Sequence, residues 1–170
     1  MAFTRQLKQM MIFIDGVGYS GEVVSITPPK LIRKMEDYRG GGMGRPVKID
    51  MGGEPLEMEA TYGGPMRAIL NMYGQLSVGA TQQRFVGSFQ NDHDGTFENI
   101  EIVTRGRHEE IDLGEWKPGE VSEFSVKSAL SYYKMLVNGV RVHEIDPVNM
   151  VEIVNGVDLM APHRAAFGLL

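Results

Sequence analysis

The sequence predicts a mainly β fold, an antiparallel β-barrel or sandwich with one packed α-helix, in a single domain of residues 1–170. Three observations lead to this prediction. Several runs alternate apolar and polar residues, as strands with one buried face do. Asn-Gly and Asp-Gly pairs separate several of these runs and are typical of hairpin turns. Only one segment has a helical spacing of apolar residues, and no internal repeat or interdomain linker divides the chain.

The chain is organised around a predicted hairpin at residues 121–146. Its turn is Asn138-Gly139, because a type I′ turn requires positive φ at both central positions. A single strand over residues 121–137 would span roughly 55 Å, whereas ordinary strands have about 3–10 residues. Either a bulge therefore interrupts the strand, or the strand extends beyond one small domain towards a neighbouring chain. The apolar parity of this strand comprises Phe124, Val126, Leu130, Tyr132 and Leu136.

The other predicted strands show the same alternation. It is clearest in residues 56–62, where Leu56 and Met58 share the apolar face and Glu57 and Glu59 share the polar face. Residues 30–38 are ambiguous, but no capping residue opens a helix there and we favour a strand. No element is predicted for the last dozen residues. Further strands are expected at residues 10–15, 19–27, 47–51, 82–90 and 96–105.

One helix is predicted at residues 65–73, packed on the outside of the sheet. Pro65 suits the first helical turn, where its missing N–H has no intrahelical partner to lose. Gly74 suits the position just after the helix. The apolar residues at positions i, i+3, i+4 and i+7 are Met66, Ile69, Leu70 and Tyr73.

Residues 39–46 form a predicted flexible loop. Four glycines fall within residues 40–44, and glycine loses more backbone entropy on ordering than any other residue. We expect this loop to remain flexible or to become ordered against a partner.

The composition excludes several classes of function. A net charge of −5 argues against a protein that grips nucleic acid through its phosphates, which requires a basic surface. The absence of cysteine excludes disulfides and thiolate chemistry. The longest apolar run has about five residues, against about 20 for a membrane span, so we predict no membrane anchor. The N-terminal residues lack the apolar region and cleavage site of a signal peptide.

Residues 16–21, GVGYSG, match the GxGxxG pattern of dinucleotide-binding enzymes. That function requires a helix whose N-terminus faces the pyrophosphate. The residues that follow are EVVSITPP, in which β-branched residues and two prolines disfavour a helix. We interpret the glycines as a hairpin turn and keep a nucleotide-binding enzyme as a remote alternative.

No catalytic, cofactor-binding or metal-binding residue is predicted. The four histidines, at positions 93, 108, 143 and 163, never pair at the spacing of metal ligands. We expect them to be solvated on the surface. The long strands combine an apolar face with a polar and partly acidic face. That polar face either meets bulk water or lines an aqueous channel shared between subunits.

Three blocks of sequence resemble the major tail tube proteins of contractile-tailed bacteriophages and R-type tailocins. The first is FIDGVGYSGEVVSITPPKLIRKMEDYRGGGM at residues 13–43. The second is TRGRHEEIDLGEWKPGE at residues 104–120, and the third is SYYKMLVNGVRVHEIDPVNMVEIVNGVD at residues 131–158. None of these blocks is a catalytic motif, and their order and spacing carry the resemblance.

The resemblance implies a structural protein, not an enzyme, that forms the inner tube of a contractile tail without a cofactor. Such proteins assemble into homo-hexameric rings, whose strands join into one ring-wide barrel, and the rings stack into a hollow tube. The implied partners are the sheath protein, the tape-measure protein, and the baseplate tube-initiator and terminator proteins. Sheath contraction drives the tube through the target envelope, so that DNA passes in a phage or ions pass in a tailocin.

The tube would be assembled in the cytoplasm of the bacterial host and would end in a virion tail or a released tailocin particle. DNA would pass without specific binding, because an acidic lumen repels its phosphates. The tube of a type VI secretion system or of an extracellular injection system is the alternative.

Two sets of residues are predicted to act in such an assembly. The inter-subunit set is drawn from the glycine-rich loop and the tip of the long hairpin, and the lumen-facing set from the polar faces of strands. The lumen-facing candidates are Glu57, Glu59, Thr61, Arg84, Ser88, Gln90, Asn99 and Glu101. The inter-subunit candidates are Arg39, Gly40, Gly41, Gly42, Met43, Gly44, Arg45, Asn138 and Gly139.

Overall fold

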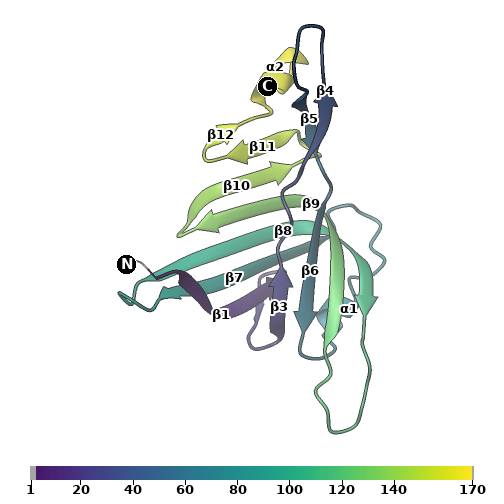
Figure 1. Cartoon of the computed structure of the whole chain (residues 1–170). Coiled ribbons are helices and arrows are strands. Elements are labelled where there is room, and N and C mark those ends of the chain that lie inside the picture. Colours follow the sequence, from purple (N-terminus) through teal and green to yellow (C-terminus); the bar gives the residue numbers. More distant parts are fainter. Residues whose placement is uncertain (1–2, 170) are drawn as a thin grey trace.

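The computed structural model describes residues 3–169 and shows a mainly β, antiparallel fold (Figure 1). Ten strands form one sheet, in the order β12-β11-β10-β9-β8-β7-β1-β2, with β6 paired to β9 and β3 paired to β6. Two further strands, β4 and β5, pair only with each other. The strands are β1 (Arg5–Ile14), β2 (Val17–Tyr19), β3 (Val23–Thr27), β4 (Arg33–Tyr38), β5 (Val47–Gly53), β6 (Leu56–Tyr62), β7 (Thr81–Asn91), β8 (Phe97–Asp112), β9 (Phe124–Val137), β10 (Val140–Asp146), β11 (Val151–Val154) and β12 (Val157–Asp158).

Strand β9 has 14 residues and explains why the central hairpin looked too long for one domain. One of its edges pairs with β8 along most of its length. Its other edge pairs with β6 from Phe124 to Leu130, and with β10 from Tyr133 to Val137. The length of β9 is therefore used within the subunit, because the strand joins two parts of the sheet that run in different directions (Figure 1).

A β-bulge at Ser131 interrupts this strand, which is one of the two possibilities raised by its length. Arg105 of β8 pairs with Tyr132 and the adjacent Gly106 pairs with Leu130, so Ser131 has no partner in β8. An extra residue moves all following side chains to the opposite face.

The bulge overturns the prediction that one parity of β9 faces the core throughout. Before it, Phe124 and Val126 lie in the hydrophobic core as predicted. After it, Tyr133 is in the core and Met135 packs against it. Tyr132 instead lies on the other face, where the Arg105 guanidinium stacks on its ring at 4.2 Å.

The core lies between β1, β6, β7, β8, β9 and the first helix. Tyr62 and Phe124 stack with their ring centroids 5.1 Å apart. Burying one such aromatic or branched aliphatic side chain stabilises a fold by about 1.5–3 kcal/mol. The inward face predicted for β6 is confirmed. The largest fully buried side chains are Tyr62, Phe85, Phe124, Ile12, Met58, Ile69, Val126 and Thr104.

The predicted helix at residues 65–73 is too long. Helix α1 (Arg67–Leu70) is a single turn, with Met66 and Ile69 buried against the core. Tyr73, predicted to share that face, is 62% exposed. Its backbone forms a bridge with His108 of β8, so pairing with the sheet competes with continuation of the helix.

A second helix, α2 (Ala161–Ala166), lies in the C-terminal segment for which no element was predicted. None of its residues is buried. No helix within residues 3–169 combines the length and apolar character needed to cross a bilayer.

The N-terminal hairpin begins earlier than predicted, and its return is divided. Asp15 and Gly16 both have positive φ, as expected for the turn. The return strand is β2, and β3 then leaves β1 to pair with β6. Residues 16–21 are therefore turn and strand, and no helix follows them before residue 30 to receive a pyrophosphate.

Candidate assembly surfaces

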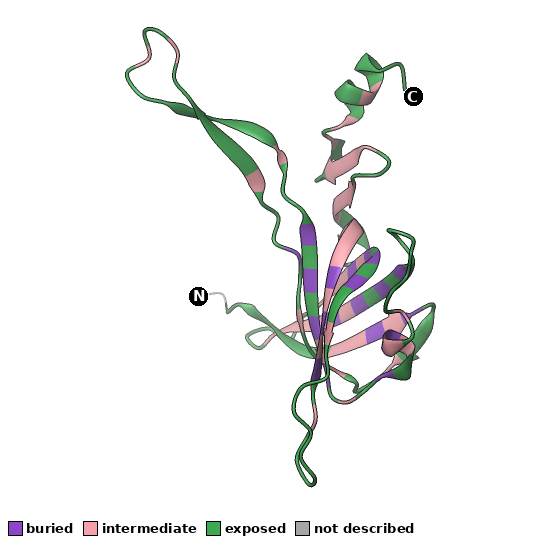
Figure 2. Cartoon of the chain, turned by 90° about the vertical axis from the view of Figure 1, so that its right-hand side faces the viewer, coloured by how far each residue is buried: buried purple, intermediate pink, exposed green. Residues whose placement is uncertain are grey.

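Strands β4 and β5 form a hairpin, here called the arm (residues 31–54), which projects from the rest of the molecule. Figure 2 shows it exposed along nearly all of its length. No residue of β4 or β5 is buried. A two-stranded hairpin is marginally stable at best in water, so the arm needs another surface to pack against. Its exposed large apolar residues include Met35, Tyr38, Val47, Ile49 and Met51.

The predicted glycine-rich loop is the tip of this arm (residues 39–46). Arg39 Nε donates a hydrogen bond to the Met43 carbonyl at 3.1 Å, and the Met43 N–H donates to the Gly40 carbonyl at 3.2 Å. Gly42 has a φ of 85°, which favours glycine at this turn. The tip thus makes its own hydrogen bonds, and its flexibility and its contact with a neighbouring subunit stay predictions.

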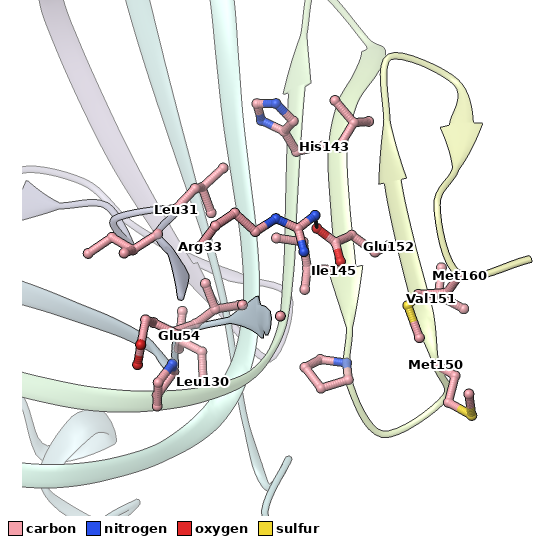
Figure 3. Close-up of a pocket in the computed structure, with 17 residues that line it drawn as sticks. Leu31, Arg33, Glu54, Leu130, His143, Ile145, Met150, Val151, Glu152 and Met160 are labelled. Atoms are coloured by element: carbon pink, nitrogen blue, oxygen red, sulfur yellow. Dashed lines mark hydrogen bonds and ion pairs between the residues drawn. The ribbon is translucent and has the colours of Figure 1, made fainter. Parts of the chain in front are cut away.

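An open cleft of about 600 Å³ lies where the arm meets β10 and β11 (Figure 3). Arg33, at the start of the arm, crosses it and forms an ion pair with Glu152 of β11. The same guanidinium lies 3.6 Å from Asp50 on the arm. The cleft is mainly apolar around this charged contact, which suits it to holding the arm at one angle. Its apolar lining includes Leu31, Ile32, Leu130, Ile145, Val151 and Met160.

One arginine, Arg164, holds helix α2 against the sheet. Arg164 of α2 donates to the Met150 carbonyl at 2.5 Å and forms an ion pair with Asp158 at 2.6 Å. The hydrogen bond from Arg164 is the main reason why the pKa of Asp158 is lowered. Leu159 and Phe167 remain exposed, so this end also presents apolar surface.

The lumen-facing candidates on β6 lie on the face opposite to the core. Glu57 and Glu59 are exposed and Thr61 is half-buried. Glu57 forms an ion pair with Lys127 of β9 at 3.4 Å, and its charge raises the pKa of Lys127. The Thr61 hydroxyl lies 3.3 Å from that of Ser125.

The candidates on β7 and β8 form a second group on the non-core side of the sheet. Arg84 forms an ion pair with Glu101 at 2.7 Å, and its guanidinium lies 4.6 Å from the centroid of the Phe13 ring. Arginine and lysine thus neutralise two of the carboxylates expected to make this face acidic. Strand β6 runs steeply across β7 and β8, so the two groups lie on differently oriented parts of the sheet (Figure 1). The other members of the second group are Ser88, Gln90 and Asn99.

The tip of the long hairpin has the predicted turn. Asn138 and Gly139 have φ values of 50° and 79° and are exposed. Asn138 also holds the edge of β8. Its side-chain oxygen accepts the Asn99 N–H at 2.9 Å, and its own N–H donates to the Asn99 carbonyl at 2.8 Å. Contact between this tip and another subunit stays a prediction.

The expectation that the histidines are solvated is wrong for His108. It is 5% exposed, and its Nδ1 lies 2.9 Å from the Ser128 hydroxyl. Burial lowers the pKa of His108 to about 4. The prediction ended the strand at residue 105, whereas β8 continues to Asp112 and its alternation carries His108 inward. Within residues 3–169, no three acidic or histidine side chains lie together as a metal site would require.

Sequence reasoning gave no assembly role to residues 109–123, here called the acidic end. They comprise the last part of β8 and the loop before β9, and they form the extremity opposite to the arm tip (Figure 1). Trp116 in this loop is 64% exposed, and its indole N–H donates to the Leu113 carbonyl at 3.0 Å. Val121 is 85% exposed. A run of acidic residues around an exposed tryptophan is the signal that could have identified this surface.

Comparison with known proteins identifies close relatives. The chain is 42% identical over 172 residues to the tail tube protein of Escherichia phage P2. The alignment covers 99% of this chain and 100% of the phage P2 protein. It is 34% identical over 173 residues to the major tail tube protein of Serratia phage KSP20, which covers 99% of both chains.

Two solved structures share the fold at much lower identity. One, from the sheath/tube terminator of the PVC extracellular contractile injection system, has a TM-score of 0.58 at 9% identity and covers 79% of this chain and 97% of that one. The other, the tube-terminating cap of the anti-feeding prophage, has a TM-score of 0.58 at 10% identity. The match covers 80% of this chain and 94% of that one. Residues 4–168 match the family of phage tail tube protein FII, which confirms the resemblance found in the sequence. The chain therefore belongs to the phage tail tube protein FII family.

Proposed function

We propose that this chain forms the inner tube of a contractile tail. Six copies close a ring, rings stack into a hollow tube, and sheath contraction drives that tube through the target envelope. The observation that carries this proposal is the arm, which exposes apolar side chains on both strands in a chain of the tail tube family. Soluble monomers rarely leave such surface uncovered.

Free strand edges support a barrel that runs around the whole ring. Residues 5–11 of β1 pair with β7 on one side, and β2 covers only the end of β1, from Ile12 to Ile14. Within residues 3–169, strand β3 pairs only with β6. Exposed edges are templates for pairing with another chain, and closure into a ring satisfies them in a controlled way.

The eight lumen-facing candidates line the channel in this proposal. The ion pairs Arg84–Glu101 and Lys127–Glu57 give that surface alternating charge. Exposed ion pairs of this kind contribute little to stability, about 0–1 kcal/mol each. Their main effect is therefore on the charge of the channel wall. A wall without a basic stripe lets DNA pass without specific binding.

The partners are those of a tail: the sheath, the tape-measure protein, and the baseplate tube-initiator and terminator proteins. Assembly takes place in the host cytoplasm, and the product is a virion tail or a released tailocin. We assign the chain a structural role and no catalytic one. Calorimetric titration with NAD, FAD and ATP is expected to give no heat of binding. A saturable heat of binding would support the alternative of a nucleotide-binding enzyme.

Electron microscopy tests the proposed function. Negative-stain images of the purified chain, alone or with the tube initiator and tape-measure protein, are expected to show rings or hollow tubes. Deletion of residues 40–44 should abolish them while leaving the far-UV circular dichroism spectrum unchanged. A chain that stays monomeric with those partners present contradicts the proposal. In a cryo-EM map of the tube, Leu56 and Met58 in the channel would refute the lumen assignment.

A further inference from the structure

The outer part of the arm is positively charged, and Asp37, opposite Lys48 in the pairing of β4 with β5, is the carboxylate at its border. Residues 39–48 contain Arg39, Arg45 and Lys48 and no carboxylate, so this stretch has a net charge of +3. All three side chains are exposed. In the described part of the chain none of them forms an ion pair, whereas Arg33 at the foot of the arm contacts both Glu152 and Asp50.

The acidic end has the opposite character. Residues 109–123 contain six carboxylates and one lysine, so their net charge of −5 equals that of the whole chain. All six acidic residues are exposed. Within residues 3–169, the only ion pair formed by any of the six joins Glu115 to Lys117, at 3.6 Å.

These two surfaces lie at opposite extremities of the subunit. The arm tip is the highest point in Figure 1 and the acidic end is the lowest, and Figure 2, turned about the vertical axis, keeps that separation. The tip therefore does not reach the acidic end of its own chain. Copies placed head to tail along this direction bring one subunit's tip to the next subunit's acidic end, and such a contact repeats without closing.

We infer that the arm tip of one subunit docks on the acidic end of a second copy in the adjacent ring, an inference that rests on the proposed tube. Charge complementarity favours a second copy of this chain as the partner. The arm tip has a net charge of +3 and the acidic end a net charge of −5, and every copy carries both surfaces. Trp116 and Val121 supply apolar area at the same place, and the indole face can accept an arginine by cation–π contact. Arginine and tryptophan are the residues most enriched in binding hot spots.

Charge reversal at both ends tests this contact. Arg45→Glu/Lys48→Glu changes the net charge of the tip from +3 to −1, and Glu115→Lys/Glu120→Lys/Glu123→Lys changes that of the acidic end from −5 to +1. Each of these two variants should slow tube growth at low salt by at least about ten-fold, because opposite charges steer association. Combining all five substitutions in one chain restores opposite charges and should restore growth. Lys30→Glu, an exposed charge reversal outside both surfaces, is the matched control.

Trp116 provides an independent readout, since it is the only tryptophan. On tube formation its emission should shift to the blue and acrylamide quenching should fall several-fold. Tubes in which Trp116 stays as quenchable as in the monomer overturn the inference and leave the proposed function intact. Charge-reversed variants that grow as fast as wild type, or a combined variant that does not recover growth, also overturn the inference. If wild type forms no tube with its initiator and tape-measure protein, the proposed function and this inference both fail.

Cross-linking checks the contact without altering charge. The chain has no cysteine, so Gly44→Cys/Val121→Cys introduces one defined pair. Oxidation of assembled tubes should give a ladder of covalent multimers that reducing agent collapses. Each single cysteine variant is the control and should form no covalent multimer larger than a dimer. Intact tubes that yield no ladder, while Trp116 remains exposed, overturn the inference.

Discussion

The arm and the body of this subunit are both built from antiparallel hairpins, yet they bury their apolar side chains very differently. In the body, formed by β1 and β6 to β10, five of the seven residues of β6 are buried or half-buried. In the arm, six of the seven residues of β5 are exposed, including Val47, Ile49 and Met51. Both strands alternate in sequence. Alternation therefore specifies a strand, whereas the surface that covers its apolar face depends on distant parts of the chain or on another chain.

The largest expected effect is in the body, at Gly106. A Cβ there would lie 2.1 Å from the Ala129 carbonyl oxygen and 2.9 Å from the Leu130 Cα, both backbone atoms next to the bulge. Gly106→Ala should therefore lower the free energy of unfolding by about 3 kcal/mol or more, because the two strands must separate.

Urea denaturation of the purified monomer measures this effect. Gly41→Ala in the arm tip is the matched control, since nothing lies within 4 Å of its added Cβ and its φ is not positive. We expect it to change stability by less than about 0.5 kcal/mol. Equal losses at the two positions would contradict the contrast between body and arm.

A pH-dependent effect of intermediate size is expected at His108. Its pKa is about 4 in the folded chain because burial disfavours the charged ring, against 6.5 in the unfolded chain. Above pH 6.5 both states hold it neutral. As the pH falls from 6.5 to about 4 only the unfolded state gains the proton, so stability falls, by up to about 3 kcal/mol.

The variant His108→Asn keeps a polar group near Ser128 and should remove most of this acid sensitivity. His163→Asn, on the exposed helix α2, is the control and should leave the pH profile unchanged. Thermal denaturation at a series of pH values between 7 and 4 gives both profiles. Parallel profiles for wild type and His108→Asn would show that another group causes the acid sensitivity.

A smaller effect is expected where arm and body meet. Arg33→Met removes the ion pair with Glu152 and should cost about 1 kcal/mol, since the side chains are partly exposed. The loss should be accompanied by faster hydrogen exchange in β4 and β5. A double-mutant cycle with Glu152→Gln isolates the pair, and Lys34→Met is the control. A coupling energy of zero with unchanged exchange would mean that the cleft alone orients the arm.

The smallest effect on the monomer is expected on the arm surface. Ile49→Ser should change the free energy of unfolding by less than about 0.5 kcal/mol, because Ile49 is 43% exposed. The same substitution at Ile102, 6% exposed in the body, should cost several kcal/mol. Tube formation, by contrast, should be impaired by Ile49→Ser, because this substitution removes apolar surface that the arm presents to a neighbouring subunit. A stable Ile49→Ser monomer that assembles normally would contradict a role of this surface in assembly.

Much of the fold could be predicted because the signals are local. Alternation in residues 56–62 placed Leu56 and Met58 inward, and the Asn138-Gly139 turn has the expected positive φ values. The errors have tertiary causes. The bulge at Ser131 depends on how β9 matches β8, and the early end of α1 coincides with the bridge between Tyr73 and His108. No local pattern records such partners.

The candidate surfaces divide in the same way. The polar parities of β6, β7 and β8 were readable because side chains alternate along a strand. The sequence did not reveal that Lys127 neutralises Glu57 and that Arg84 neutralises Glu101. Each of these ion pairs joins residues on two neighbouring strands. The acidic end was visible as composition, but its place opposite the arm tip emerges only in three dimensions (Figure 1).

The sequence alone indicates a β protein with glycine-marked turns, and its three blocks indicate the tail tube family. These features depend on residues close together in the chain. The tertiary structure alone shows that β9 serves two parts of the sheet, that His108 is buried and that, within residues 3–169, the two strands of the arm pair only with each other. Those outcomes depend on which distant strands meet, and that is settled by the packing of the whole chain.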